Sequence, residues 1–142
     1  MRIVVVAAGR IREKAMRAVA DDYLARIRHY ARCDEVEVKA AGELARAVPE
    51  GATLVVLEPD GDAVTSREFA RRLERWGARG KGIVALVLGA ADGIPPELTK
   101  RADARLSLTT LTLPHRLARV VLFEQLYRAF SILRGEPYAR ED

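Results

Sequence analysis

Residues Leu106 to Phe130 read LSLTTLTLPHRLARVVLFEQLYRAF, and the three parts of this segment predict three different structures. The first part mixes leucines with one serine and three threonines, which is typical of a strand end that becomes a loop. Pro114 interrupts a regular strand and suits the first turn of a helix. From Arg116 to Leu133 apolar residues lie on more than one face, which predicts a helix that is buried on several sides.

The apolar side chains on several faces of such a helix need more packing partners than one short chain readily provides. The chain has 142 residues, which favours a single domain over residues 1–142. A second copy of the chain is therefore a natural partner for the Arg116 to Leu133 helix, and we expect a homodimer. An ordinary buried C-terminal helix is the alternative, and periodicity alone favours that simpler interpretation.

Upstream of this segment, short apolar runs alternate with helical patterns. Strands are predicted at Arg2 to Ala8, Val36 to Val38, Thr53 to Leu57, Ile83 to Leu88 and Ala104 to Leu108. Helices are predicted at Glu13 to Arg32, Glu43 to Val48, Thr65 to Gly77 and Glu97 to Arg101. Thr65 and Glu68 have the spacing of a capping box at the start of one helix. This alternation predicts the α/β class with a mainly parallel sheet.

Composition excludes several classes of protein. Hydrophobic residues make up 49% and charged residues 31% of the chain, which is typical of a globular domain. No run of about 18 apolar residues occurs, so no membrane span is expected. Cys33 is the only cysteine, which excludes an internal disulfide and favours a reducing, cytoplasmic compartment. The two histidines are His29 and His115, and together with one cysteine they are too few to predict a metal site from the ligand count.

The charge of the chain gives only a weak indication of its partner. The net charge is +4, and 20 of the 24 basic residues are arginine. Arginine binds phosphate groups bidentately, and a basic surface attracts nucleic acid. Arginine bias can also follow from genome composition, and +4 is modest. The charge therefore favours nucleic acid only slightly over a small acidic ligand.

Three loops follow predicted strand ends, namely Glu58 to Asp62, Gly89 to Gly93 and Thr109 to Pro114. Ligands of parallel α/β sheets bind at the carboxyl ends of strands, so these loops are the candidate site. Glycines in two of them allow a ligand to approach the backbone closely, although plain turn glycines are the commoner interpretation. Neither glycine loop has the spacing of a known phosphate-binding loop. The hydroxyl-rich segment Leu108 to Leu113 offers backbone N–H and C=O groups to the edge of a purine ring.

The order of these segments is similar to that of a known family. The most specific part is Ser107-Leu108-Thr109-Thr110-Leu111-Thr112-Leu113-Pro114-His115, followed by Glu124-Gln125-Leu126-Tyr127-Arg128-Ala129. Leu57 with its loop, Gly89 to Gly93, and Pro137-Tyr138 extend the match over nearly the whole chain. Together they resemble the RlmH family of SPOUT-superfamily methyltransferases. These enzymes methylate the N3 position of a pseudouridine in large-subunit (23S) ribosomal RNA.

The resemblance implies an α/β knot, in which the C-terminal segment threads through a loop to form a deep trefoil, a rare exception among chain topologies. It implies S-adenosylmethionine as the cofactor and a homodimer with the last helix in the interface. The cofactor pocket would be lined by Leu57, Gly89, Leu108, Thr109, Thr110, Leu111, Thr112 and Leu113. The tail after Gly135 would reach the partner's active site. Because the tail beyond Pro137 is too polar to pack by itself, we expect the partner or RNA to hold it.

The chain departs from the family pattern at three places. Gly89-Ala90-Ala91 stands where the family commonly has Gly-Gly-Pro or a close variant, and the segment between Val38 and Thr53 is shorter than usual. The tail reads Tyr138-Ala139-Arg140, whereas the family usually has a histidine between the tyrosine and the basic residue. Ala139 cannot act as a general base, so any catalytic role in the tail falls to its neighbours.

The implied reaction suggests three catalytic candidates. The target imide nitrogen must lose a proton, so a nearby base or cation would help. Arg140 can stabilise the developing anion, with Tyr138 beside it in the sequence. His115, next to the predicted pocket, is the third candidate. A second interpretation, at least as good, is that His115 only orients the loop next to Pro114.

Two other functions stay open at this point. The chain could be a non-catalytic RNA-binding or ribosome-assembly protein that kept the knot fold but lost activity with the change at Ala139. Without the resemblance, it could be a small nucleotide-binding α/β domain. Cofactor binding separates the enzyme from the nucleotide-binding domain, and methyl transfer to ribosomes separates it from the assembly protein.

Overall fold

The computed structural model describes the backbone of residues 1–141 and the side chains of residues 1–139. At its centre is a five-stranded sheet with the order β2-β1-β4-β3-β5, in which all neighbouring strands run parallel. The strands are β1 (Arg2–Ala8), β2 (Arg32–Val38), β3 (Thr53–Ala63), β4 (Ile83–Leu88) and β5 (Ala104–Ser107). The predicted α/β class with a parallel sheet is confirmed, and the threading of the C-terminal segment into a knot stays a prediction.

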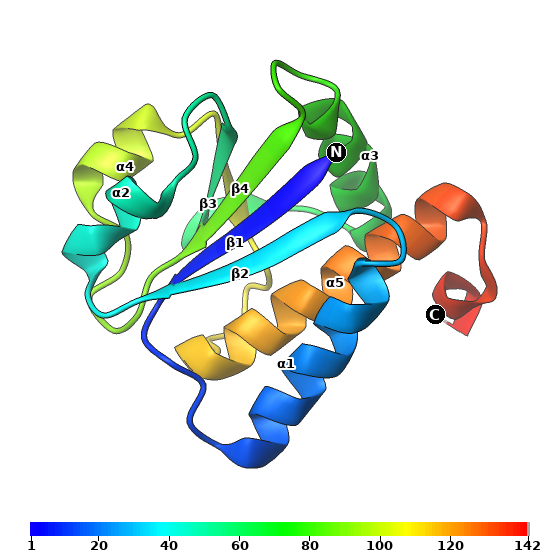
Figure 1. Cartoon of the computed structure of the whole chain (residues 1–142), viewed down its shortest axis with the longest axis horizontal. Coiled ribbons are helices and arrows are strands. Elements are labelled where there is room, and N and C mark those ends of the chain that lie inside the picture. Colours follow the sequence, from blue (N-terminus) through cyan, green and yellow to red (C-terminus); the bar gives the residue numbers. More distant parts are fainter. Residues whose placement is uncertain (142) are drawn as a thin grey trace.

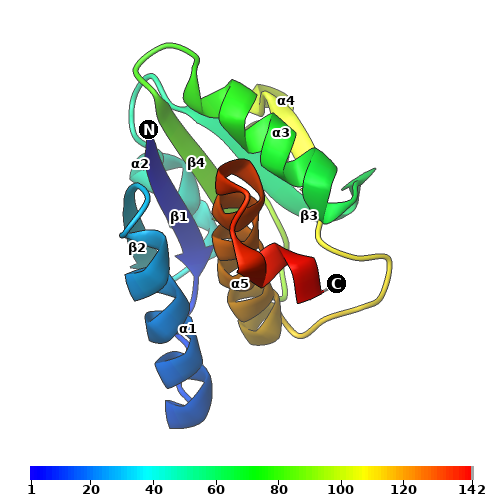
Figure 2. The same cartoon turned by 90° about the vertical axis from the view of Figure 1, so that its right-hand side faces the viewer.

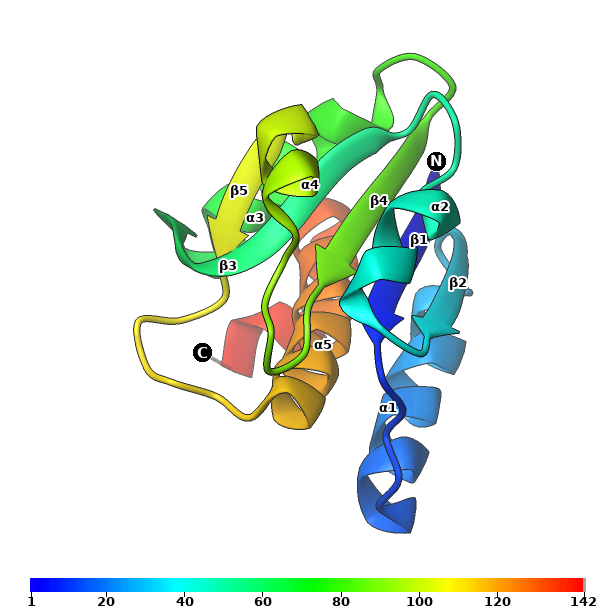
Figure 3. The ribbon, with the colours of Figure 1, turned by 90° about the vertical axis from the view of Figure 1, so that its left-hand side faces the viewer.

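Helices cover both faces of the sheet (Figure 1). One face carries α1 (Lys14–Ile27), α3 (Ser66–Gly77) and α5 (His115–Arg134), which lie side by side in Figure 2. The other face carries α2 (Leu44–Ala47) and α4 (Pro96–Arg101), seen in front of the sheet in Figure 3. Short 3-10 turns, η1 (Ala41–Glu43) and η2 (Pro137–Glu141), precede α2 and end the chain. Within the described residues, no helix has the length and apolarity needed to cross a membrane.

The central strands are buried on both faces because alternate side chains point to opposite sides of a sheet. Val5 and Leu86 belong to the apolar cluster that also contains side chains of α1, α3 and α5. Val4 and Val87 belong to the second cluster, with side chains of α2 and α4. This two-sided burial explains why the strands read as continuous apolar runs in the sequence.

Strand β3 is longer than the strand predicted to end at Leu57. After an irregularity in register that begins at Leu57, β3 pairs with β5 again, with Asp62 opposite Leu106. Gly61 lies so close to β5 that an added Cβ would come within 2.7 Å of backbone atoms of Leu106. The prediction of a loop over residues 58–62 is therefore wrong at its far end. The segment is a bulge that is held against β5.

Other element boundaries differ by a few residues. Helix α1 ends at Ile27 rather than Arg32, because β2 already begins at Arg32 and pairs there with Arg2. Helix α3 begins as predicted: the hydroxyl of Thr65 accepts a hydrogen bond of 3.1 Å from the amide of Glu68.

The C-terminal tail packs on its own chain. Gly135 closes α5 in the left-handed region, with φ of 65°, as a C-capping glycine does. The ring of Tyr138 then contacts Tyr127 at 4.6 Å between centroids, and its hydroxyl donates to Glu124 at 2.6 Å. The expectation that only a partner or RNA would hold the tail is therefore wrong for Tyr138. The sequence shows a polar segment, but this one aromatic side chain finds a partner on α5.

Candidate functional site

A cavity opens at the carboxyl edge of the sheet, where the chain leaves β3, β4 and β5. Its volume is about 330 Å³, which is within the range of small-molecule sites. Figure 3 shows the segments after β4 and β5 at this edge, together with the start of α5. The lining residues come from three segments and from the first turns of α5: residues 57–59, residues 88–91 with 93 and 94, residues 107–113, His115 and Ala118.

The segment after β4 forms one wall of the cavity and turns back on itself. The amide of Gly93 donates to the carbonyl of Ala90 at 2.9 Å, and Gly93 has φ of 74°. An added Cβ at Gly89 would lie 2.4 Å from the carbonyl oxygen of Gly93. Position 89 therefore has to be glycine because its own loop crosses there. The sequence suggested a different reason, the approach of a ligand.

The segment after β5 forms the opposite wall and is held by its hydroxyl groups. The hydroxyl of Ser107 donates to the carbonyl of Thr109 at 2.9 Å, and the amide of Leu111 donates to the hydroxyl of Thr109 at 3.1 Å. No hydrogen bond within the described chain engages the backbone groups of Thr110 or Thr112. These groups are available to a ligand, as the sequence predicted for this segment. Leu111 is 75% exposed, a high value for a leucine.

The lining of the cavity includes a carboxylate, Glu58, that the sequence did not single out. Glu58 accepts hydrogen bonds from the guanidinium of Arg105 at 2.6 and 2.8 Å and from the hydroxyl of Thr99. The bond to Glu58, and a second contact with Asp60, raise the pKa of Arg105 above its ordinary value. Because both carboxylate oxygens are engaged, Glu58 holds the β3 bulge against β5 rather than offering a free base. Spacing alone could not reveal this pair, because its members are 47 positions apart.

The cavity brings together all of the residues predicted to line a cofactor pocket. Leu57, Gly89 and the run from Leu108 to Leu113 all contribute to its walls, and His115 stands at the first turn of α5. Two catalytic candidates do not join them. Tyr138 does not line the cavity of its own chain, and the side chain of Arg140 lies outside the described residues.

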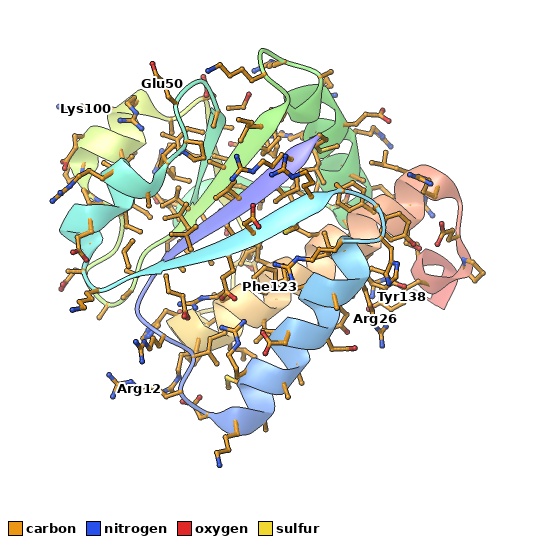
Figure 4. All side chains as sticks on the ribbon, in the orientation of Figure 1. Arg12, Arg26, Glu50, Lys100, Phe123 and Tyr138 are labelled. Atoms are coloured by element: carbon orange, nitrogen blue, oxygen red, sulfur yellow. The ribbon has the colours of Figure 1, made fainter. Side chains whose placement is uncertain are left out.

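Tyr138 lies at the far end of α5 from the cavity (Figure 4). Burial raises the pKa of its phenol well above the ordinary value, and the hydrogen bond to Glu124 raises it further. The sign follows from the charges, since both a dry surrounding and a nearby carboxylate disfavour a phenolate. Tyr138 therefore stays protonated at neutral pH and acts as a hydrogen-bond donor, not as a base.

Two further groups can be excluded from chemistry at this site. Burial raises the pKa of the Cys33 thiol to about 12, so this group is not a thiolate nucleophile at neutral pH. Among the described residues, no three side chains of the histidine, cysteine and carboxylate types are grouped as metal ligands. What remains is a small-molecule cavity with apolar walls, including Leu57, Leu88 and Leu108, and with unpaired backbone groups on one side.

This arrangement fits a cofactor that combines a flat heterocycle with a short charged chain. Leucine side chains offer a dry slot to a ring, and unpaired backbone groups offer hydrogen bonds to its edge. None of the described residues that line the cavity is a lysine or an arginine, which disfavours a di- or triphosphate. S-adenosylmethionine, an adenine nucleoside without a phosphate group, satisfies these conditions.

Comparison with known proteins agrees with this assignment. Residues 1–139 match the family described as predicted SPOUT methyltransferase. A protein of Sorangium cellulosum named ribosomal RNA large subunit methyltransferase H is 52% identical, with 98% of this chain and 99% of that protein covered. A protein of the same name from Roseobacter denitrificans is 44% identical over 99% of both chains.

Solved structures support the fold. A probable methylase family protein from Haemophilus influenzae superposes with a TM-score of 0.57 at 15% identity, covering 94% of this chain and 67% of the other. A probable rRNA-methyltransferase from Porphyromonas gingivalis gives a TM-score of 0.53 at 11% identity, covering 93% and 69%. The family match over nearly the whole chain and the identity to these relatives agree with the resemblance read from residues 107–129, and the chain belongs to the RlmH family of SPOUT methyltransferases.

Proposed function

We propose that this protein transfers a methyl group from S-adenosylmethionine to the N3 position of a pseudouridine in large-subunit ribosomal RNA. The observation that carries the proposal is the cavity at the carboxyl edge of the sheet, whose two walls are residues 88–94 and 107–113. The names of the relatives support large-subunit rRNA as the substrate. The choice of the N3 position rests on the family resemblance of the same segment.

The residues that would hold the cofactor are those with apolar surface or free backbone groups in the cavity. Leu57 and Leu108 flank the slot, and the backbone of Thr110 and Thr112 supplies hydrogen bonds. When bound, S-adenosylmethionine supplies an electrophilic methyl group on a sulfonium, and the imide nitrogen takes this methyl group as the C–S bond breaks and the N3 proton leaves. The protein therefore has to orient the base, exclude water and accommodate the leaving proton.

The described residues offer one group for that proton within the cavity. His115 is exposed at the first turn of α5 and lines the cavity, so it is the proposed acceptor of the leaving proton. Arg140 is the proposed electrostatic group for the forming imidate, as a cation aimed at developing negative charge lowers the barrier. Because Tyr138 is protonated, its role is to hold the tail through Glu124.

We further propose that the enzyme is a homodimer with α5 in the interface. Leu117 and Val121 of α5 are only half-buried and belong to neither apolar cluster of the fold. A second copy would cover them, and would place its tail near this cavity. Light scattering at micromolar concentration is expected to give twice the mass of the 15.7 kDa chain. A mass equal to one chain would contradict the proposal.

The tail is expected to contribute to the chemical step. We predict that Arg140→Ala keeps the cofactor affinity but lowers methyl transfer roughly tenfold or more, the scale of one lost electrostatic contact. The measurement is single-turnover transfer of labelled methyl to purified ribosomes that lack the modification. Arg79→Ala, an exposed arginine between α3 and β4, serves as the control for a simple loss of charge.

The outcomes separate the two functions that remain. A wild-type rate in Arg140→Ala would show that the tail is not catalytic. Complete inactivity of the unmutated protein on ribosomes, with RNA binding retained, would instead favour a non-catalytic assembly protein. The change at Ala139 is the sequence observation that keeps this second function in view.

A further inference from the structure

Three cations stand together on the segment between β1 and α1. Arg10 and Arg12 lie in the loop, and Lys14 is the first residue of α1. All three side chains are exposed, and none has a carboxylate partner within the described residues. Figure 4 shows Arg12 at the edge of the molecule, well separated from Tyr138. We call these three residues the β1–α1 cationic segment.

Free cations are unusual in this part of the molecule, because the neighbouring arginines are paired. Arg17 contacts Asp21 at 2.9 Å and Glu35 at 2.5 Å, and Arg26 contacts Asp22 at 3.0 Å. The carboxylate inside the cationic segment, Glu13, is itself neutralised by Arg116 at 3.0 Å. The segment therefore presents an unbalanced positive charge to solvent.

Two contacts place this segment beside the cavity. The guanidinium of Arg119 donates to the carbonyl of Gly9 at 2.8 Å, and Arg116 pairs with Glu13, so the loop lies against the first turns of α5. The same two turns line the cavity through His115 and Ala118. Because β1 is parallel to its neighbours, its loop leaves the sheet at the edge where the cavity opens. Figure 3 shows the segment after β1 and the start of α5 at this edge.

We propose that Arg10, Arg12 and Lys14 bind the phosphate backbone of the ribosomal RNA strand that flanks the target nucleotide. This inference rests on the proposed function, since it assigns the substrate contact of the same site. Three unpaired cations on one short segment favour a polyanion as the partner, and arginine binds phosphate bidentately. A membrane surface fits less well, because no exposed large apolar side chain lies in residues 9–14 to insert beside them.

The amino end of α1 strengthens the attraction. Its first backbone N–H groups have no partner within the helix, and they carry partial positive charge toward the same solvent region. Phosphate contacts of this kind position a nucleic acid without reading its sequence. The choice of nucleotide is then left to the cavity, and the cationic segment supplies affinity and orientation.

The test uses two double variants that remove the same charge from opposite ends of the parallel strands. One pair of residues follows β1, and the other pair precedes β4. Arg10→Ala with Arg12→Ala removes two cations of the segment. Arg79→Ala with Lys81→Ala removes two exposed cations between α3 and β4, which have no ion-pair partner among the described residues. Both pairs lie in loops, so neither variant removes a buried side chain.

Binding is measured by fluorescence anisotropy on a labelled fragment of large-subunit rRNA, over a series of salt concentrations. The cationic-segment variant is expected to bind roughly tenfold more weakly at 0.1 M salt, with the slope of log affinity against log salt reduced by about 1.5. The control variant is expected to match the wild type in both. Affinity for S-adenosylmethionine, measured by calorimetry, is expected to be unchanged in both variants.

The proposal is overturned if the cationic-segment variant binds RNA with the same affinity and the same salt slope as the control variant. Failure of the proposed function would look different. A wild type that binds rRNA through the segment but transfers no methyl group would leave this inference standing and remove the enzymatic function. If the wild type methylates rRNA but the double substitution leaves RNA binding unchanged, the enzymatic function stands and this inference falls.

Discussion

Replacing Arg119 by alanine is expected to lower the free energy of unfolding by roughly 3–5 kcal/mol, the range for breaking one side of a buried ion pair. Arg119 lies on α5 and is 1% exposed. Its guanidinium contacts Glu35 at 3.1 Å, Glu37, and the carbonyl of Gly9 at 2.8 Å. Removing the guanidinium leaves a largely buried carboxylate at Glu35, whose side chain is 9% exposed.

Part of this loss is compensated by a second cation. Arg17 contacts Glu35 at 2.5 Å and Glu37 at 3.5 Å, so both carboxylates keep one partner when Arg119 is removed. The Nε of Arg119 has no hydrogen-bond partner, and its burial already costs some stability. Both facts favour the lower end of the range.

Urea unfolding at one fixed protein concentration is the measurement, because the proposed dimer would make stability depend on concentration. Arg119→Met keeps most of the side-chain volume and isolates the effect of the charge. Arg2→Ala breaks an ion pair in which the side chains of Arg2 and Asp34 are 36% and 47% exposed. This exposed pair is expected to contribute less than about 1 kcal/mol to the free energy of unfolding. An Arg119→Ala protein as stable as Arg2→Ala would show that the buried network is not a stabilising feature.

The Arg119 network shows where sequence reasoning stops. The apolar pattern of α5 predicted a helix buried on several sides, and α1 and α3 do cover it. The same pattern gave no reason to place an arginine at a fully buried position of this helix. Its partners Glu35 and Glu37 lie two residues apart on β2 and so face the same side, but the sequence does not reveal which helix they meet.

The position of the cavity could be predicted from the sequence, whereas other contacts of the site could not. Parallel strands leave one sheet edge together, so the loops after β3, β4 and β5 had to be neighbours once the class was known. The ion pair between Glu58 and Arg105 and the packing of Tyr138 on Tyr127 depend on strand order and on the course of the chain after α5. Neither follows from local periodicity, and both were missed.

Replacing Gly89 by valine is expected to abolish S-adenosylmethionine binding. An added Cβ at this position lies 2.4 Å from the carbonyl oxygen of Gly93, closer than Cβ atoms approach any backbone atom, so residues 89–93 have to move. The same residues form a wall of the cavity through Gly89, Ala90 and Gly93. The shift that relieves the collision therefore deforms the cofactor site itself.

Two further glycines separate this effect from a general sensitivity to substitution. Gly42→Ala adds its Cβ in open space at an ordinary φ and is expected to bind S-adenosylmethionine as the wild type does. Gly93→Ala also meets open space but has φ of 74°, so strain of about 1–2 kcal/mol is expected there, with weakened but measurable binding.

Isothermal calorimetry with S-adenosylmethionine measures the three affinities, and circular dichroism with thermal melting verifies that each variant is folded. If Gly89→Val proves unstable, Gly89→Ala places the same Cβ with less bulk and is expected to weaken binding at least about tenfold, or ~1.4 kcal/mol. Wild-type affinity in a folded Gly89→Val protein would mean that the cofactor binds away from the segment after β4. Loss of binding in Gly89→Val alone, with Gly42→Ala intact, would tie the cofactor to the wall that this glycine allows the loop to form.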